Sequence, residues 1–164
     1  MTTYINAVAT HAVLADGALV YDAYMPIAGA RFPTPINNCA ASPVRGSDRW
    51  VIQTPGSAPV IAIQTLSDFY PLDGFYSRRA DATGADGNYR LYEIAGAGHI
   101  WSTQVAYTPS GDEPVRAGFP ANWDPYCNGE PTTFPSEYPI DGALANPFRW
   151  VRDGFPRRRP RGSR

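Results

Sequence analysis

Two short runs of β-branched and aromatic residues, 58–65 and 88–96, constrain the fold of this chain most. The first, APVIAIQT, is apolar through its centre, as in a strand buried on both faces of a parallel sheet. The second, NYRLYEIAG, alternates like a second strand. Residues 71–82 between them predict a short helix, because Pro71 suits a first helical turn and a Gly/Asp loop follows. Strand, crossover helix and strand form a βαβ unit, so the sequence predicts an α/β fold with a parallel sheet.

The flanking segments add further elements to this unit. Residues 19–27, LVYDAYMPI, predict a third strand, and the amphipathic segment 3–15 before it predicts a helix. Residues 138–154 predict a last helix from apolar residues at helical spacing. Pro147 lies inside that segment and is expected to kink or split the helix.

Two long segments, 28–58 and 102–139, interrupt the regular pattern and are rich in proline and glycine. Loops of this length are uncommon in compact domains and usually form a lid, a binding surface or a disordered arm. Trp50, Trp101 and Trp123 fall in or beside them. These aromatic residues either pack the loops onto the body of the domain or form an apolar substrate pocket. We therefore expect one domain over 1–156 with two lid-like insertions.

Composition excludes several classes of function. The net charge is −1, with no basic stripe interleaved with aromatics, which argues against a nucleic-acid partner. The basic run at 157–164 is interpreted as a disordered, solvated tail, with a phosphate- or partner-binding tail as the alternative. No run approaches the ~20 apolar residues that span a bilayer. The chain has two histidines and no Cys-x-x-Cys, His-Glu-x-x-His or glycine-rich phosphate loop, so no metal or cofactor is expected.

The compartment is left open by the sequence. Cys39 and Cys127 lie far apart in loop-like surroundings, and one disulfide or two free thiols fit equally well. The chain shows no secretory signal, so the cytoplasm is the default localisation. A signal encoded upstream would instead send the protein to the periplasm or outside the cell.

Asp68 and His99 are the candidate catalytic residues. Each follows the carboxyl end of a predicted strand, and they are 31 residues apart in the sequence. Parallel strands of one βαβ unit end at the same edge of a sheet, so an acid and an imidazole are expected to meet there. The carboxylate would accept a hydrogen bond from Nδ1–H and leave Nε2 free as a general base. Taken alone, Asp68 is more typical of a turn or a helix cap, whereas His11 has no nearby acid and is expected at the surface or at the edge of the core.

A nucleophile is the missing member of this set. The sequence contains no Gly-x-Ser-x-Gly motif. Ser67 and Ser102 flank the acid and the histidine without a strand–turn–helix context. Cys39 and Cys127 are conceivable partners of His99, but they lie in irregular loops.

Four stretches, taken in order, resemble the later part of the α/β-hydrolase fold, in a branch described as "α/β hydrolase domain" proteins. They are TTYINAV, PVIAIQTLSD, YRLYEIAGAGH and FRWVRDG. The resemblance implies about three mainly parallel strands with flanking helices. It also implies that Asp68 is the acid and His99 the base of a catalytic triad. In that branch the first stretch follows the nucleophile elbow, so we expect the serine to lie upstream of Met1.

Three hypotheses follow for function, the last of them a complete small enzyme with an unrecognised nucleophile. In the first, the chain is the acid/histidine half of a serine esterase that acts on small-molecule esters, and it is inactive alone because the serine and its oxyanion donors are absent. In the second, it is a non-catalytic fragment or binding module. This module would self-associate, or pair with the missing N-terminal half, through an exposed sheet edge.

Overall fold

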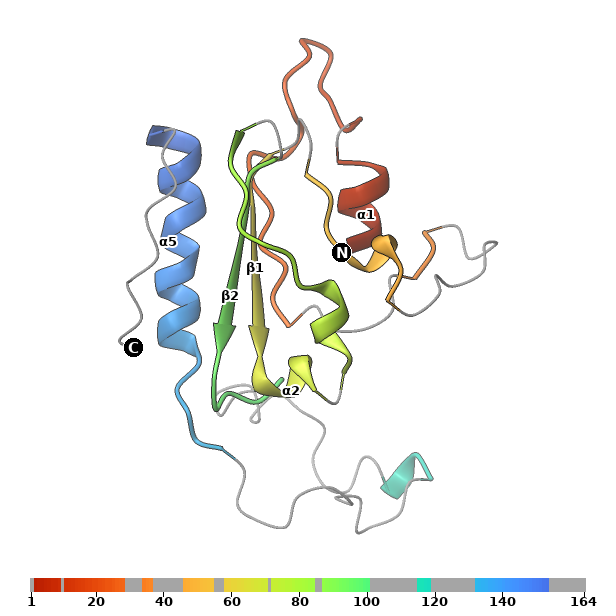
Figure 1. Ribbon diagram of the computed structural model, residues 1–164, viewed down its shortest axis with the longest axis vertical. Helices are drawn as coiled ribbons and strands as arrows, with labels where there is room; N and C mark the ends of the chain where they lie inside the picture. Colours follow the sequence, from red (N-terminus) through yellow and green to blue (C-terminus); the bar gives the residue numbers. More distant parts are fainter. Residues whose placement is uncertain are drawn as a thin grey trace.

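The computed structural model describes residues 2–9, 11–28, 34–36, 46–54, 58–70, 72–84, 87–100, 115–118 and 132–153. Two strands, three α-helices and two short 3₁₀ helices are named within these ranges (Figure 1). In chain order they are α1 (Thr2–Ala7), η1 (Asp48–Trp50), β1 (Val60–Thr65), α2 (Leu66–Phe69), η2 (Gly74–Ser77), β2 (Tyr89–Ile94) and α5 (Glu137–Asp153).

A parallel pair of strands, β1 and β2, forms the centre of the fold. Their register runs from Val60 opposite Tyr89 to Thr65 opposite Ile94. Both expected strands are confirmed, as is their parallel pairing. The crossover between them brings their carboxyl ends to one edge of the sheet (Figure 1).

The third expected strand, 19–27, is reduced to two isolated parallel bridges with β1. Tyr24 pairs with Val60, and Ile27 pairs with Ile63. Pro26 lies between these bridges and has no N–H to donate, so the ladder is interrupted there. The segment nevertheless extends the parallel arrangement on the side of β1 opposite β2.

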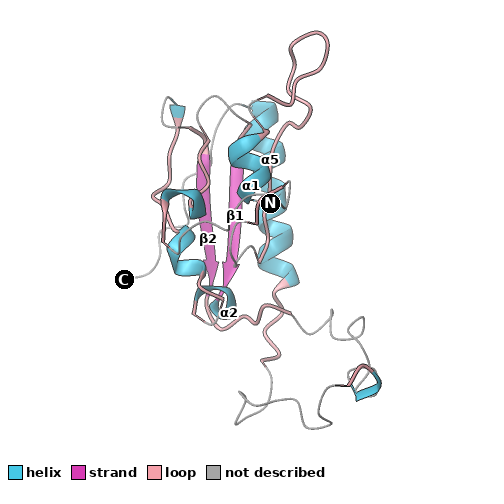
Figure 2. Ribbon diagram, turned by 90° about the vertical axis from the view of Figure 1, so that its right-hand side faces the viewer, coloured by secondary structure: helices cyan, strands magenta, loops and turns pink. Residues whose placement is uncertain are grey.

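Helices cover both faces of β1 (Figures 1 and 2). Val60 and Ala62 belong to a cluster with Ile5 of α1, whereas Ile61 and Ile63 belong to a second cluster with Trp150 of α5. All six residues of β1 are buried. Burying each isoleucine stabilises the fold by about 1.5–3 kcal/mol, and the continuous apolar run is explained by burial on both faces.

The opening helix is shorter than expected. The sequence pattern predicted a helix over 3–15, but α1 ends at Ala7 and an antiparallel bridge joins Val13 to Leu19. A turn at Asp16 and Gly17 makes this bridge possible: the Asp16 carboxylate accepts the Ala18 N–H, and Gly17 has φ of 85°. The helix predicted from the amphipathic pattern was therefore too long at its C-terminal end. His11, between α1 and this turn, is exposed as expected.

The crossover differs from the expected helix over 71–82, and that prediction was wrong. A one-turn helix, α2, begins directly after β1, and the 3₁₀ helix η2 follows. Asp73 separates them in a left-handed conformation with φ of 62°, which a continuous helix cannot contain. The chain thus crosses between the strands with two short turns.

The last helix, α5, is a single helix of 17 residues and continues through Pro147. The sequence predicted a kink or a split at this proline, and the helix is not split there. Pro147 is buried, and its apolar ring lies on the side of the helix that contacts the rest of the fold. Within the described ranges, none of the helices has the length and apolar character needed to cross a bilayer.

Several predicted features lie outside the described residues: Cys39, Cys127, Trp101, Trp123, Ser102 and the basic run 157–164. Most of both insertions lies outside as well. Trp50 is described and is 2% exposed, and its ring packs edge-on against Tyr76 at 5.5 Å. For this residue the structure favours packing of the loop onto the domain body over a pocket.

Candidate functional site

The carboxyl ends of β1 and β2 bring Asp68 and His99 into contact. The distance between His99 Nδ1 and Asp68 Oδ1 is 2.5 Å. Asp68 is fully buried, whereas the His99 side chain is 43% exposed. The acid is therefore shielded from solvent while the ring that it contacts remains accessible.

Asp68 lies in α2 because a capping box starts that helix at the end of β1. The Thr65 hydroxyl accepts the Asp68 backbone N–H at 3.4 Å, and the Asp68 carboxylate accepts the Thr65 backbone N–H at 2.7 Å. The sequence offered a helix cap and a catalytic acid as alternatives for Asp68. The structure shows that Asp68 is the third helical residue of this capping box, with Thr65 as the N-cap, and that its other carboxylate oxygen contacts His99.

A second set of contacts fixes the backbone beneath the acid. The buried Gln64 side chain donates from Nε2 to the Ser77 hydroxyl at 2.6 Å and to the Gly74 carbonyl at 3.2 Å. Gly74 packs so closely against Asp68 that an added Cβ would lie 2.6 Å from the Asp68 carbonyl oxygen. The η2 turn is thereby held against α2, and only glycine fits at that position.

His99 lies on a glycine-containing turn that follows β2. Gly96 adopts φ of 75°, a left-handed conformation that glycine tolerates best. The Ala97 carbonyl accepts the Leu66 backbone N–H at 3.2 Å, which joins this turn to the start of α2. The Thr132 hydroxyl donates to the Gly96 carbonyl at 2.8 Å from the segment that precedes α5. These contacts place the imidazole beside the acid.

The hydrogen bonds of Asp68 determine what the imidazole can do. An ionised carboxylate only accepts hydrogen bonds, so opposite such a group the proton of a neutral imidazole is expected on Nδ1, the atom that faces Oδ1. Nε2 of the neutral ring is then an acceptor and a potential base. Among the described residues, no serine hydroxyl or cysteine thiol is hydrogen-bonded to the His99 ring. Those residues also contain no cluster of three or more His, Cys, Asp or Glu side chains able to hold a metal ion.

Comparison with protein families gives a match over nearly the whole chain. Residues 1–163 match the family model described as the alpha/beta hydrolase domain. The chain belongs to this family. Neither the curated proteins nor the solved structures gave a match. The small parallel sheet with flanking helices corresponds to part of an α/β-hydrolase domain.

The sequence predicted two residues of this candidate site, Asp68 and His99, but not Thr65. The signal was available, since a threonine three residues before an aspartate has the spacing of a capping box. The role of Gln64 could not be found in this way, because its partners Gly74 and Ser77 depend on the unexpected η2 turn.

Proposed function

We propose that this α/β-hydrolase chain supplies the acid and the base of a Ser-His-Asp triad that hydrolyses carboxylic esters of small molecules. The contact between the buried Asp68 and the accessible His99, at the carboxyl ends of two parallel strands, is the observation that carries this proposal. Membership of the alpha/beta hydrolase domain family supports it. The nucleophilic serine is contributed from outside residues 1–164, because the sequence contains no Gly-x-Ser-x-Gly motif.

The proposed reaction uses the two side chains as follows. Nε2 of His99 takes the proton of the serine hydroxyl as its oxygen attacks the ester carbonyl, and the resulting imidazolium then protonates the departing alkoxide. A water molecule, activated by the same nitrogen, releases the acid and regenerates the serine. Asp68 remains ionised, holds the ring through Nδ1–H and stabilises the imidazolium.

Residues 1–164 alone are therefore expected to have negligible esterase activity. Loss of a nucleophile costs several orders of magnitude in rate, and the oxyanion donors are absent with it. The test is turnover of a nitrophenyl ester by purified 1–164, with His99→Ala as the matched control. Efficient turnover that disappears in His99→Ala would show that the nucleophile lies within these residues.

A complementary observation is the coding sequence that precedes the Met1 codon. We expect a Gly-x-Ser-x-Gly elbow there, in frame or one frameshift away. A longer chain that includes it should hydrolyse the ester and lose that activity in His99→Ala. A longer chain with the elbow that stays inactive would contradict the hydrolase proposal.

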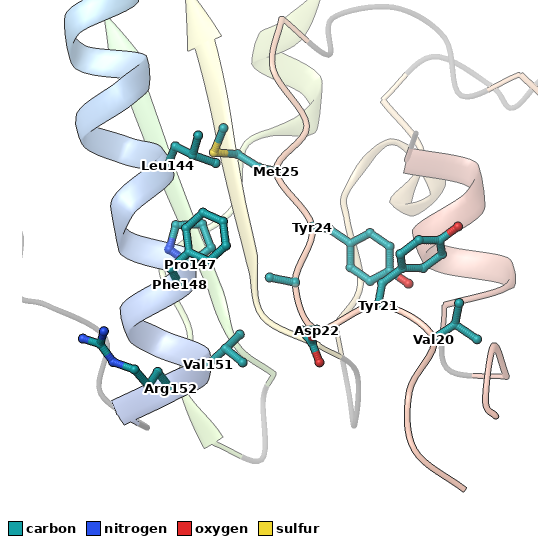
Figure 3. A pocket seen from close by; sticks show the side chains of 11 residues that line it. Val20, Tyr21, Asp22, Tyr24, Met25, Leu144, Pro147, Phe148, Val151 and Arg152 are labelled. Atoms are coloured by element: carbon teal, nitrogen blue, oxygen red, sulfur yellow. The ribbon is translucent and has the colours of Figure 1, made fainter. Parts of the chain in front are cut away.

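A second candidate function, association through the sheet edge, is favoured by an apolar groove beside segment 20–25. The groove encloses about 550 Å³ and runs between this segment and α5, where Met25 faces Leu144 and Phe148 (Figure 3). Phe148 is 69% exposed and Tyr21 is 50% exposed. The edge formed by segment 24–27 also has no further strand beside it among the described residues.

This association would be with the segment that supplies the serine or with a second copy of the chain. Purified 1–164 is expected to form dimers or larger species by light scattering and to bind a dye that reports apolar surface. A monodisperse monomer that binds no dye would count against association.

A further inference from the structure

The Thr65 side chain is buried at the end of β1 and contacts the candidate acid directly. It is 2% exposed, and its hydroxyl donates to Asp68 Oδ2 at 2.8 Å. Its backbone N–H donates to the same oxygen at 2.7 Å. One residue therefore supplies two donors to Oδ2, while the other oxygen, Oδ1, faces His99.

We propose that Thr65 is a positioning residue that fixes the orientation of the Asp68 carboxylate, so that one of its oxygens faces His99 and favours the Nδ1–H tautomer of the imidazole. This inference rests on the proposed function, in which Nε2 must be free of its proton to act as the base. A buried carboxylate needs hydrogen-bond donors for both of its oxygens. With one oxygen held by both Thr65 donors, the other faces His99, and rotation of the carboxylate out of this arrangement is disfavoured.

The geometry separates this role from simple helix capping. The bond in which the hydroxyl caps the helix, from the Asp68 backbone N–H, is long at 3.4 Å. The bond from the same hydroxyl to the Asp68 carboxylate is 2.8 Å, within the ordinary range for O–H···O contacts. The shorter of the two contacts is thus with the charged group that faces His99.

The experiment measures the tautomer of His99 in 15N-labelled residues 1–164 by imidazole nitrogen shifts at neutral pH. His11 is the other histidine of the chain, and because it is exposed it provides an internal reference for a ring at the surface. The unsubstituted chain is expected to hold its proton on Nδ1. Thr65→Val removes the hydroxyl but keeps the β-branched shape and the backbone donor. The ratio of Nδ1–H to Nε2–H forms should fall about tenfold or more, as expected when one hydrogen bond to a charged group is lost.

Two further variants distinguish positioning from a general loss of stability. Thr65→Ser keeps the hydroxyl and should keep the ratio. Thr54→Val alters another fully buried threonine, with 0% exposure, that lies outside the site. This substitution should change the melting temperature of the chain and leave the tautomer ratio of His99 unchanged. A Thr65→Val chain with an unchanged ratio, or a folded Thr65→Ser chain that loses it, would overturn the proposal. If Thr65→Val does not fold, the tautomer ratio of His99 measured in Thr65→Ser tests the proposal. No turnover is required, so this inference and the hydrolase proposal can fail separately.

Discussion

Replacing Asp68 with asparagine tests the candidate site most directly, because the amide keeps the shape of the carboxylate and removes one acceptor. Both Thr65 donors face the position of Oδ2. The single oxygen of the introduced amide must take that position, which turns its NH₂ group toward His99. Nδ1 then has to accept a hydrogen bond, and the ring proton moves to Nε2, where it blocks the base.

The size of this effect follows from the donors that would otherwise be lost. In the opposite orientation of the amide, two buried donors of Thr65 would face an NH₂ group and have no acceptor. Each such group costs about 1–3 kcal/mol, so the proposed orientation is preferred by roughly 2–6 kcal/mol. Even the lower value means that the proposed orientation of the amide outnumbers the opposite one about 30-fold, since 1.4 kcal/mol is a factor of ten.

The assay is again the pair of imidazole nitrogen shifts, compared between the unsubstituted chain and Asp68→Asn. Asp81→Asn is the matched control, because Asp81 accepts the Leu91 backbone N–H within the same βαβ unit but does not touch His99. In an assembled Ser-His-Asp site, Asp68→Asn should also lower kcat by about 10⁴-fold. A folded Asp68→Asn chain that still holds its proton on Nδ1 would refute the reasoning.

The remaining predictions concern stability and are measured by urea unfolding. Gly74→Ala should destabilise the fold by about 1–3 kcal/mol or more, because the new Cβ would lie 2.6 Å from the Asp68 carbonyl oxygen. In α5, a Cβ added at Gly142 would meet nothing within 4 Å, so Gly142→Ala should stabilise the fold by about 0.5–1 kcal/mol. Equal effects of the two substitutions on the free energy of unfolding would contradict the packing described for Gly74. Burial raises the pKa of Tyr89 to about 12 from 10.0; among the smaller effects, the charge of Arg79 lowers this pKa and those of Asp81 and Glu93 raise it. The unfolded state therefore loses this proton first, so the free energy of unfolding should fall by up to about 2–3 kcal/mol as the pH rises from 10 to 12. Tyr89→Phe should reduce this fall in the free energy of unfolding. If the fall is unchanged in Tyr89→Phe, it arises from other titrating groups.

The strand pair and the acid–histidine contact could be predicted because their signals are local. The apolar run that became β1 had one explanation, burial on both faces, and residues after two parallel strands meet at one edge. The contact between Asp68 and His99 follows from this topology without any knowledge of side-chain packing.

Other elements depended on information that periodicity does not contain. The helix expected over 71–82 failed because the capping box of Thr65 starts a helix earlier and Asp73 adopts a left-handed conformation. The third strand was limited by the missing N–H of Pro26. Pro147, in contrast, was expected to kink or split the last helix, but α5 is not split there and the proline is buried against the rest of the fold.

The closeness of the site residues in sequence has a consequence for its dynamics. Asp68, Thr65 and His99 all belong to the stretch from β1 to the turn after β2, and the contact between acid and base closes a loop of 31 residues. A loop of this length has a modest closure entropy, and a βαβ unit of this kind is expected to open cooperatively as one foldon. Exchange of the amide protons of β1 and β2 would then follow the same opening event that separates His99 from Asp68. The lifetime of the acid–base pair becomes a property of this unit's local unfolding and is measurable by hydrogen exchange without any substrate.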